Sequence, residues 1–236
     1  MYEYRNKTSV NVHDVDYNGI ARTSSVLRYL QSAAEAQLCE NGMSYDELYG
    51  RKRAFILSRI KLELSKPLRS DTPVTAVTFP CESRGFSFLR CYALEQDGET
   101  VARAVSLWAL VDTDTHGLVR VNDFELGLPT LPPLSLELGR MKLPSSLTEV
   151  GKYTVHYGEI DRNRHMNNTK YPDIYSTFLP LEGKMIRSIS INYLNEARLG
   201  ERLRVLRAEV GGGYYFRTLL EDGRVNSEAE LELCDI

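Results

Sequence analysis

One short segment of the 236-residue chain carries three side chains of catalytic type at alternating positions, Asp161, Asn163 and His165. In an extended turn this spacing would project the three groups to one side, just before a predicted helix. Unbonded N–H groups at a helix start can stabilise an oxyanion, and a histidine can transfer protons. Taken alone, Asp-x-Asn before a helix is more typical of turn and capping chemistry, so its interpretation depends on the rest of the chain.

The segment is the second occurrence of a pattern that the chain contains twice. Four residues of the first copy recur in register in the second: Val10, Val15, Asp16 and Asn18 match Val155, Ile160, Asp161 and Asn163. Further along, the strand Ile60-x-Leu62-x-Leu64 matches Ile189-x-Ile191-x-Tyr193, after a shorter interval. Two matches in the same order indicate an internal duplication whose second copy has the shorter helix.

The two copies differ at two positions where catalysis would need a titratable side chain. Ile20 stands where the second copy has His165, and Pro67 stands where it has Glu196. Isoleucine and proline side chains cannot transfer a proton, so only the second copy holds a titratable pair. This asymmetry predicts that the polar turn of the second copy and Glu196 form one site, with Glu196 at a strand end beside His165.

The first copy predicts one long helix followed by an antiparallel meander. Apolar residues recur at helical spacing over Thr23–Glu40, with Thr23 or Ser24 as the N-cap and Asn41-Gly42 as the stop. From Ala54 the apolar pattern changes to a period of two, which is typical of strands. The expected strands are 1–12, 54–65, 74–81, 86–95 and 101–112.

Residues 125–150 interrupt this order. They contain Pro129, Pro132, Pro133 and Pro144 without a clean period, and we expect an ordered linker. The order then restarts, with strands expected at 153–157, 185–195, 202–210, 214–220 and 224–233 and a short helix over 169–178. This is an α+β order. It predicts two tandem hotdog domains, each a helix wrapped by a curled antiparallel sheet, that form a pseudo-dimer over 1–124 and 151–236.

Composition narrows the classes of function. The net charge of −3 gives no basic excess for nucleic acid, so a docked anionic protein would need a local basic patch. The run Arg51-Lys52-Arg53 is a candidate patch, although a solvated turn is the plainer interpretation. The four cysteines lack metal-type spacing, and neither a signal segment nor a membrane span is evident. We expect a cytoplasmic protein without a metal or cofactor.

Two motifs resemble the acyl-acyl carrier protein (acyl-ACP) thioesterases of plants and bacteria. Residues 161–171 resemble the D-x-N-x-H-x-N-N-x-x-Y segment of that family. In the first copy, Ser106, Trp108, Asp112 and Thr115 are similar to its S-x-W-x-x-x-D-x-x-T strand. The resemblance spans nearly the whole chain.

Carried over by residue, the resemblance implies that Asp161, Asn163, His165 and Glu196 form the catalytic set. It also implies that the first copy shapes the acyl pocket through Thr23–Glu40 and 54–65. Plant members have a cysteine directly after the glutamate, whereas this chain has Ala197. A covalent cysteine mechanism is therefore excluded there, which favours Glu196 as the general base on water, with direct attack by Glu196 as the rival.

The implied partner is an acyl carrier protein bearing a phosphopantetheine-linked fatty acyl chain. Because the plastid transit segment of plant members is not found, the resemblance favours a bacterial enzyme of fatty-acid biosynthesis. An acyl-CoA thioesterase of the same fold and a non-catalytic acyl-binding protein remain as alternatives. The tandem repeat supplies its own pseudo-dimer, so both a monomer and a homodimer are compatible with the sequence.

Overall fold

The computed structural model describes residues 3–236. The first copy contains one long helix, one short helix and a meander of strands. Its elements are β1 (Tyr4–Val10), α1 (Thr23–Glu40), α2 (Tyr45–Gly50), β2 (Arg53–Leu64), β3 (Thr72–Pro80), β4 (Ser87–Gln96), β5 (Glu99–Asp112) and β6 (Leu118–Val119), with 3-10 turns η1 (Val12–Asp14) and η2 (Val121–Asp123). The long helix has the predicted bounds, whereas α2 and β6 were not predicted.

The second copy repeats this order with a much shorter helix. Its elements are β7 (Thr148–Thr154), η3 (Tyr157–Glu159), η4 (Asn168–Lys170), α3 (Tyr171–Ser176), β8 (Lys184–Tyr193), β9 (Arg202–Val210), β10 (Gly213–Leu219) and β11 (Val225–Asp235). The strand predicted at 153–157 is wrong, because the strand β7 begins at Thr148, inside the stretch predicted as linker, and ends at Thr154. Beyond it, Val155 is buried and the chain turns into η3.

All strands join one antiparallel sheet in the order β1-β3-β4-β5-β2-β8-β11-β10-β9-β7, with β6 beside β5. At its centre β2 pairs with β8, so that Ile60 faces Ile191 and Leu62 faces Ile189. The repeat equates Ile60 with Ile189 and Leu62 with Ile191, so a two-fold pseudosymmetry axis exchanges the two pairs. The duplication inferred from the sequence is confirmed by this register.

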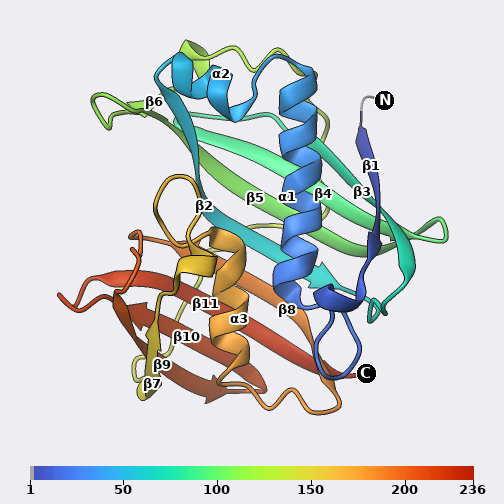
Figure 1. Cartoon of the computed structure of the whole chain (residues 1–236), viewed down its shortest axis with the longest axis vertical. Coiled ribbons are helices and arrows are strands. Elements are labelled where there is room, and N and C mark those ends of the chain that lie inside the picture. The colour runs from blue at the N-terminus through green and yellow to red at the C-terminus, as the bar shows by residue number, and fades with distance from the viewer. Residues whose placement is uncertain (1–2) are drawn as a thin grey trace.

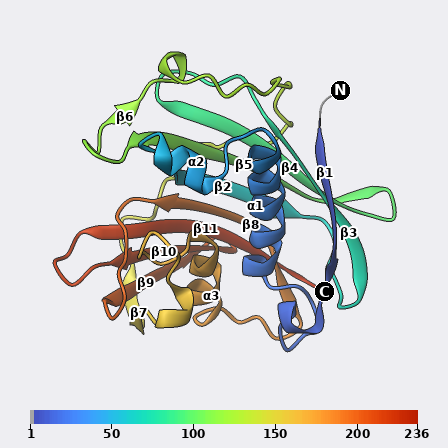
Figure 2. The same ribbon diagram turned by 45° about the horizontal axis from the view of Figure 1, so that its top comes forward.

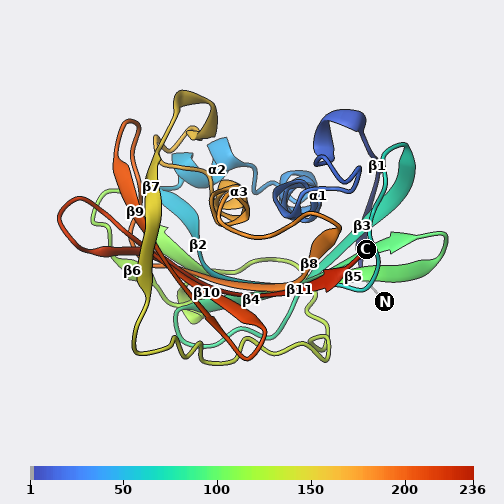
Figure 3. The same cartoon turned by 90° about the horizontal axis from the view of Figure 1, so that it is seen from below.

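Helices α1 and α3 lie side by side on the same face of the sheet (Figures 1 and 2). Seen from below, the outer strands β1 and β7 rise on either side of them, so that the sheet curls around the helices (Figure 3). The buried faces of both copies share one hydrophobic core, in which Leu30, Ala33, Ile60 and Ile189 are fully inaccessible to solvent. The expected α+β fold of two tandem hotdog units is confirmed.

The bounds of α1 agree with the prediction, but its N-cap differs. The N-cap is Arg22, without a side-chain cap, and Thr23 and Ser24 are the first helical residues. The reason lies in the preceding turn, because the Arg22 N–H donates to the carbonyl of Asp14 (2.9 Å) and fixes where the helix can begin. At the other end the prediction holds, since Asn41 is the C-cap and Gly42 takes the left-handed conformation (φ 68°).

The proline-rich segment after residue 124 crosses the face of the sheet opposite the helices (Figure 3). Leu131, Leu134, Leu136 and Leu138 pack on the first copy there, and Leu136 joins Phe79, Cys91 and Val105 in a small buried cluster. The segment is therefore ordered by apolar packing despite its lack of secondary structure. None of the helices among the described residues is long and apolar enough to cross a membrane.

Candidate active site

The second-copy turn is compact rather than extended. Asp161 accepts the Asn163 N–H on its side chain (2.8 Å), and the Asp161 N–H donates to the carbonyl of His165 (3.0 Å). Arg164 takes the left-handed conformation (φ 66°) that closes the turn. The expectation of an extended turn is therefore wrong. Asp161 instead stabilises the turn through its side chain, which was the alternative considered from the sequence.

The first copy builds the same turn. Asp16 accepts the Asn18 N–H (2.8 Å), and Gly19 is left-handed (φ 73°) where the second copy has Arg164. The shared turn means that the fold, rather than the chemistry, requires an aspartate at this position in both copies.

His165 and Glu196 form a direct pair. His165 Nε2 lies 2.9 Å from Glu196 Oε2, and the histidine side chain is 26% exposed while the glutamate is 51% exposed. Their segments are joined by backbone contacts, because the Met166 N–H donates to the carbonyl of Ala197 (2.8 Å) and His165 bridges to Arg198. The pair is therefore held rigidly at its base and open to water at the carboxylate.

The first copy keeps this frame without the functional groups. Ile20 bridges to Arg69, and the Ala21 N–H donates to the carbonyl of Leu68 (2.7 Å), as in the second copy. Ile20 is only 4% exposed, in contrast to His165. The same backbone thus supports a buried apolar contact in one copy and a partly exposed acid–base pair in the other.

Asn163 is oriented by the other copy. Tyr45, on α2, donates its hydroxyl to Asn163 Oδ1 (2.6 Å). Arg162 lies over the Tyr45 ring, 3.9 Å from the ring centroid, and pairs with Asp46 (2.6 Å). Within residues 3–236 the Asn163 Nδ2 group has no hydrogen-bond partner, so it is free to donate to a substrate carbonyl.

Tyr45 was missed in the sequence, although a signal for α2 was present. Ser44 and Glu47 form a capping box, in which Ser44 accepts the Glu47 N–H and Glu47 accepts the Ser44 N–H. Burial raises the pKa of Tyr45, against an opposing effect of the Arg162 charge, so the hydroxyl is a neutral donor at neutral pH.

The helix start after the turn offers fewer donors than expected. The Thr169 N–H donates to Asn167 Oδ1 (3.0 Å), and the Lys170 N–H donates to the Asn167 carbonyl (2.9 Å). Pro172, in the first turn of α3, has no N–H. The expectation that free helix N–H groups hold an oxyanion is therefore wrong for these positions, whereas Asn163 Nδ2 has no hydrogen-bond partner among the described residues.

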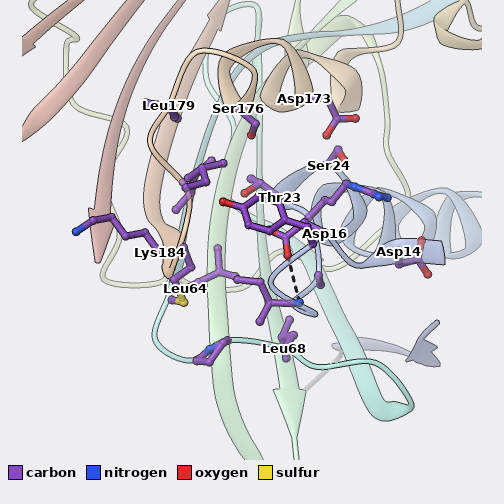
Figure 4. A pocket seen from close by; sticks show the side chains of 18 of the residues that line it. Asp14, Asp16, Thr23, Ser24, Leu64, Leu68, Asp173, Ser176, Leu179 and Lys184 are labelled. Atoms are coloured by element: carbon purple, nitrogen blue, oxygen red, sulfur yellow. Dashed lines mark hydrogen bonds between the residues drawn. The ribbon is translucent and has the colours of Figure 1, made fainter. Parts of the chain in front are cut away.

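A cavity of about 760 Å³ lies around the first-copy turn and not at the His165–Glu196 pair (Figure 4). Ile20, Pro67 and Leu68 are among its lining residues, and they occupy the positions of His165, Glu196 and Ala197. Asn18 does not offer a free amide there, because Asn18 Nδ2 donates to the carbonyl of Leu181 (2.8 Å). The cavity therefore lies at the member of the pseudosymmetric pair that has no histidine or glutamate at these two positions.

Thiols are remote from the pair. Cys81 and Cys91 are buried within the first copy, Cys39 lies in the last turn of α1, and Cys234 lies near the end of β11. Ala197, directly after Glu196, is fully buried. The arrangement offers a carboxylate, an imidazole and an amide donor, and no thiol among the described residues adjoins them.

The fold and the site together define a double-hotdog protein with a histidine–glutamate pair in its second copy. Sequence models of the N-terminal and C-terminal domains of acyl-ACP thioesterases match residues 1–125 and 144–232. The chain therefore belongs to the acyl-ACP thioesterase family.

Plant relatives match most of this chain. A palmitoyl-ACP thioesterase of Cuphea hookeriana is 26% identical over 248 residues, covering 93% of this chain and 59% of the relative. An oleoyl-ACP thioesterase of Arabidopsis thaliana is 25% identical over 223 residues, covering 84% of this chain and 60% of the relative. The chain thus spans about three-fifths of the length of these relatives.

Two solved structures share the fold. An acyl-ACP thioesterase of Bacteroides thetaiotaomicron superposes with a TM-score of 0.91 at 20% identity, covering 98% of each chain. The 12:0-ACP thioesterase of Umbellularia californica gives a TM-score of 0.85 at 19% identity, covering 99% of this chain and 98% of the other.

Replacing Tyr45 with Phe tests the orientation of Asn163. The substitution removes one hydrogen bond, of about 0.5–1.5 kcal/mol, from the side-chain amide of Asn163. We expect kcat for thioester hydrolysis to fall by about 2–10-fold. Tyr49→Phe is the matched control, because Tyr49 stacks on Tyr45 and is 55% exposed. Equal losses in both variants would show that the Tyr45 hydroxyl has no specific role.

Proposed function

We propose that this protein hydrolyses the thioester of a fatty acyl-ACP and releases the free fatty acid. The observation that carries the proposal is the His165–Glu196 pair, 2.9 Å apart, which exists in one copy while the other has Ile20 and Pro67 in the same frame. Membership of the acyl-ACP thioesterase family and the names of the plant relatives support the substrate class.

In the proposed mechanism Glu196 is the general base. Its half-exposed carboxylate can take a proton from a water molecule, which then attacks the thioester carbonyl. Asn163 Nδ2 donates to the carbonyl oxygen as it becomes negative. The tetrahedral intermediate collapses with cleavage of the C–S bond, and the pantetheine thiolate takes up the proton. His165 holds the carboxylate through its Nε2, and Asp161 holds the turn.

Arginines near the site suit an acidic carrier protein. Arg164, in the turn, and Arg198, two residues after Glu196, are exposed and form no ion pair with other described residues. The run considered earlier is less suitable, because Lys52 pairs with Asp114 (3.1 Å) and Arg53 with Asp112 (2.5 Å). We therefore place carrier docking on the rim formed by Arg164 and Arg198.

The His165→Ala variant tests the pair. Loss of an acid–base or orienting group should lower kcat by roughly 10²–10⁴-fold, in an assay that measures fatty acid released from acyl-ACP. Asp16→Ala is the control, since Asp16 forms the equivalent turn in the first copy and should affect mainly stability. If Asp16→Ala abolished turnover in a folded protein while His165→Ala did not, the assignment of the copies would be reversed.

A single turnover in ¹⁸O-labelled water, with enzyme in excess, separates general-base attack from direct attack by Glu196. Under general-base attack the label enters the fatty acid and Glu196 stays unlabelled. An acyl-enzyme anhydride opened by water at the carbonyl of Glu196 would leave label in that side chain. Mass spectrometry of the peptide that contains Glu196 detects that route, and label in that peptide would exclude the proposed mechanism.

Reversing the charge of the rim tests the carrier. The double variant Arg164→Glu, Arg198→Glu should raise KM for acyl-ACP several-fold, most strongly at low ionic strength, and leave KM for acyl-CoA little changed. Arg187→Glu, exposed near the opposite end of β8, is the control. A KM for acyl-ACP that does not respond to the double variant would remove these arginines from the docking surface.

A further inference from the structure

A buried polar network lies directly behind the segment that carries Glu196. Its centre is Asn226, at the start of β11, which is fully inaccessible to solvent. Asn226 Nδ2 donates to the backbone carbonyl of Asn195 (2.5 Å) and to the hydroxyl oxygen of Tyr171 (3.0 Å). Asn226 Oδ1 accepts the hydroxyl of Thr218 (2.8 Å). Because a carbonyl only accepts, the contact with Asn195 fixes which end of the amide faces the segment.

The bonded carbonyl belongs to the peptide that immediately precedes Glu196. The backbone of the same segment is also held from β11, since the N–H groups of Leu194 and Asn195 donate to the Asn226 carbonyl (2.9 and 3.1 Å). The bond from the Asn226 side chain has a different effect. It fixes the orientation of the peptide plane between Asn195 and Glu196, and therefore the starting direction of the Glu196 side chain.

The same amide reaches the segment that follows the His165 turn. Tyr171 is the first residue of α3, and its ring packs edge-on against Tyr193, with 5.1 Å between ring centroids. Tyr193 in turn donates to the carbonyl of Asn168 (2.9 Å). Burial raises the pKa of Tyr171 to about 12, and the charge of Glu196 adds to the increase, while the bond from Asn226 opposes it. Asn226 thus links the two segments that must hold the pair together.

The first copy provides an internal comparison. Ser65 donates its N–H to the carbonyl of Val101 (2.9 Å), as Leu194 does to that of Asn226, so Val101 is the equivalent of Asn226. By strand register Leu94 and Ala102 are the equivalents of Thr218 and Ser227. The same fold therefore forms with apolar residues at all three positions, and the polar network is not a requirement of the fold.

The peptide before the equivalent of Glu196 is also fixed in the first copy, by different means. There the residue is Pro67, whose ring limits its own φ to about −65°. Glu196 has no such covalent restraint. We propose that Asn226 is a positioning residue for thioester hydrolysis, which clamps the carbonyl before Glu196 and thereby holds its carboxylate against His165. This inference rests on the proposed function.

Two single substitutions at neighbouring positions test the clamp, which is the bond from Asn226 Nδ2 to the carbonyl of Asn195. Asn226→Val and Ser227→Ala each replace a buried polar residue with its first-copy equivalent. Ser227 bonds to Tyr175 (2.8 Å) and Thr218 (2.6 Å) and not to the Glu196 segment, so it is a matched control. We expect both variants to melt at lower temperature. Only Asn226→Val should lose kcat, by about 10–100-fold, with KM for acyl-ACP close to that of the wild type.

Asn226→Asp is a second test that nearly preserves volume. At neutral pH its carboxylate would place an acceptor against the Asn195 carbonyl and abolish the clamp. As the pH falls, protonation restores one O–H donor, so the deficit in kcat relative to the wild type should shrink while circular dichroism stays constant.

The outcomes are distinct. Unchanged kcat in folded Asn226→Val, an equal loss in Ser227→Ala, or a deficit in Asn226→Asp that is independent of pH would each overturn the clamp. Absence of acyl-ACP hydrolysis by the wild-type protein in the same assay would instead refute the proposed function.

Discussion

The antiparallel pairing of β2 with β8 is the constraint on which the rest of the structure depends. In an isolated copy each of these strands would be a sheet edge with unpaired N–H and C=O groups. Pairing them makes one continuous sheet and brings α1 and α3 over a shared core (Figure 3). Its register places Lys61 opposite Ser190, which the repeat equates with each other, and so fixes the pseudosymmetry axis. That axis decides where each polar turn meets the other copy.

Each turn reaches across the axis through its asparagine, with opposite consequences. Asn18 uses both ends of its amide on the backbone of residues 181–184, where it accepts the Gly183 N–H (3.2 Å) and donates to Leu181. Asn163 accepts a single bond from Tyr45 and keeps its donor free. One asparagine has therefore become part of the packing between copies, while the other remains available to a ligand. The duplication allowed this division because the frame of each turn is made by backbone bonds and the shared aspartate, and does not depend on the side chains at the positions of His165 and Glu196.

The sequence predicted the elements whose signals are local. Helix α1 and the strands β2–β5 and β8–β11 have strong periodicity and were placed to within two residues. Strand β7 was misplaced because its alternation is weak and its partner, β9, lies far along the chain. The position of Glu196 beside His165 followed from comparing the copies. Tyr45 and Asn226 could not be found in this way, because their roles arise from contacts between distant segments that no local pattern records.

The second copy combines a short helix with a buried polar network beside the segment of Glu196. Helix α1 covers its half of the sheet with 18 residues, whereas α3 has six. Tyr171 and Tyr175 belong to this short helix and are buried, and a buried hydroxyl requires a partner because an unsatisfied polar group costs about 1–3 kcal/mol. Asn226 and Ser227 supply those partners, and Thr218 bonds to both in turn. The polar network therefore satisfies the two hydroxyl groups that the helix buries. Within this network Asn226 donates one amide hydrogen to Tyr171 and accepts the hydroxyl of Thr218. Its second amide hydrogen bonds to the carbonyl of Asn195, directly before Glu196.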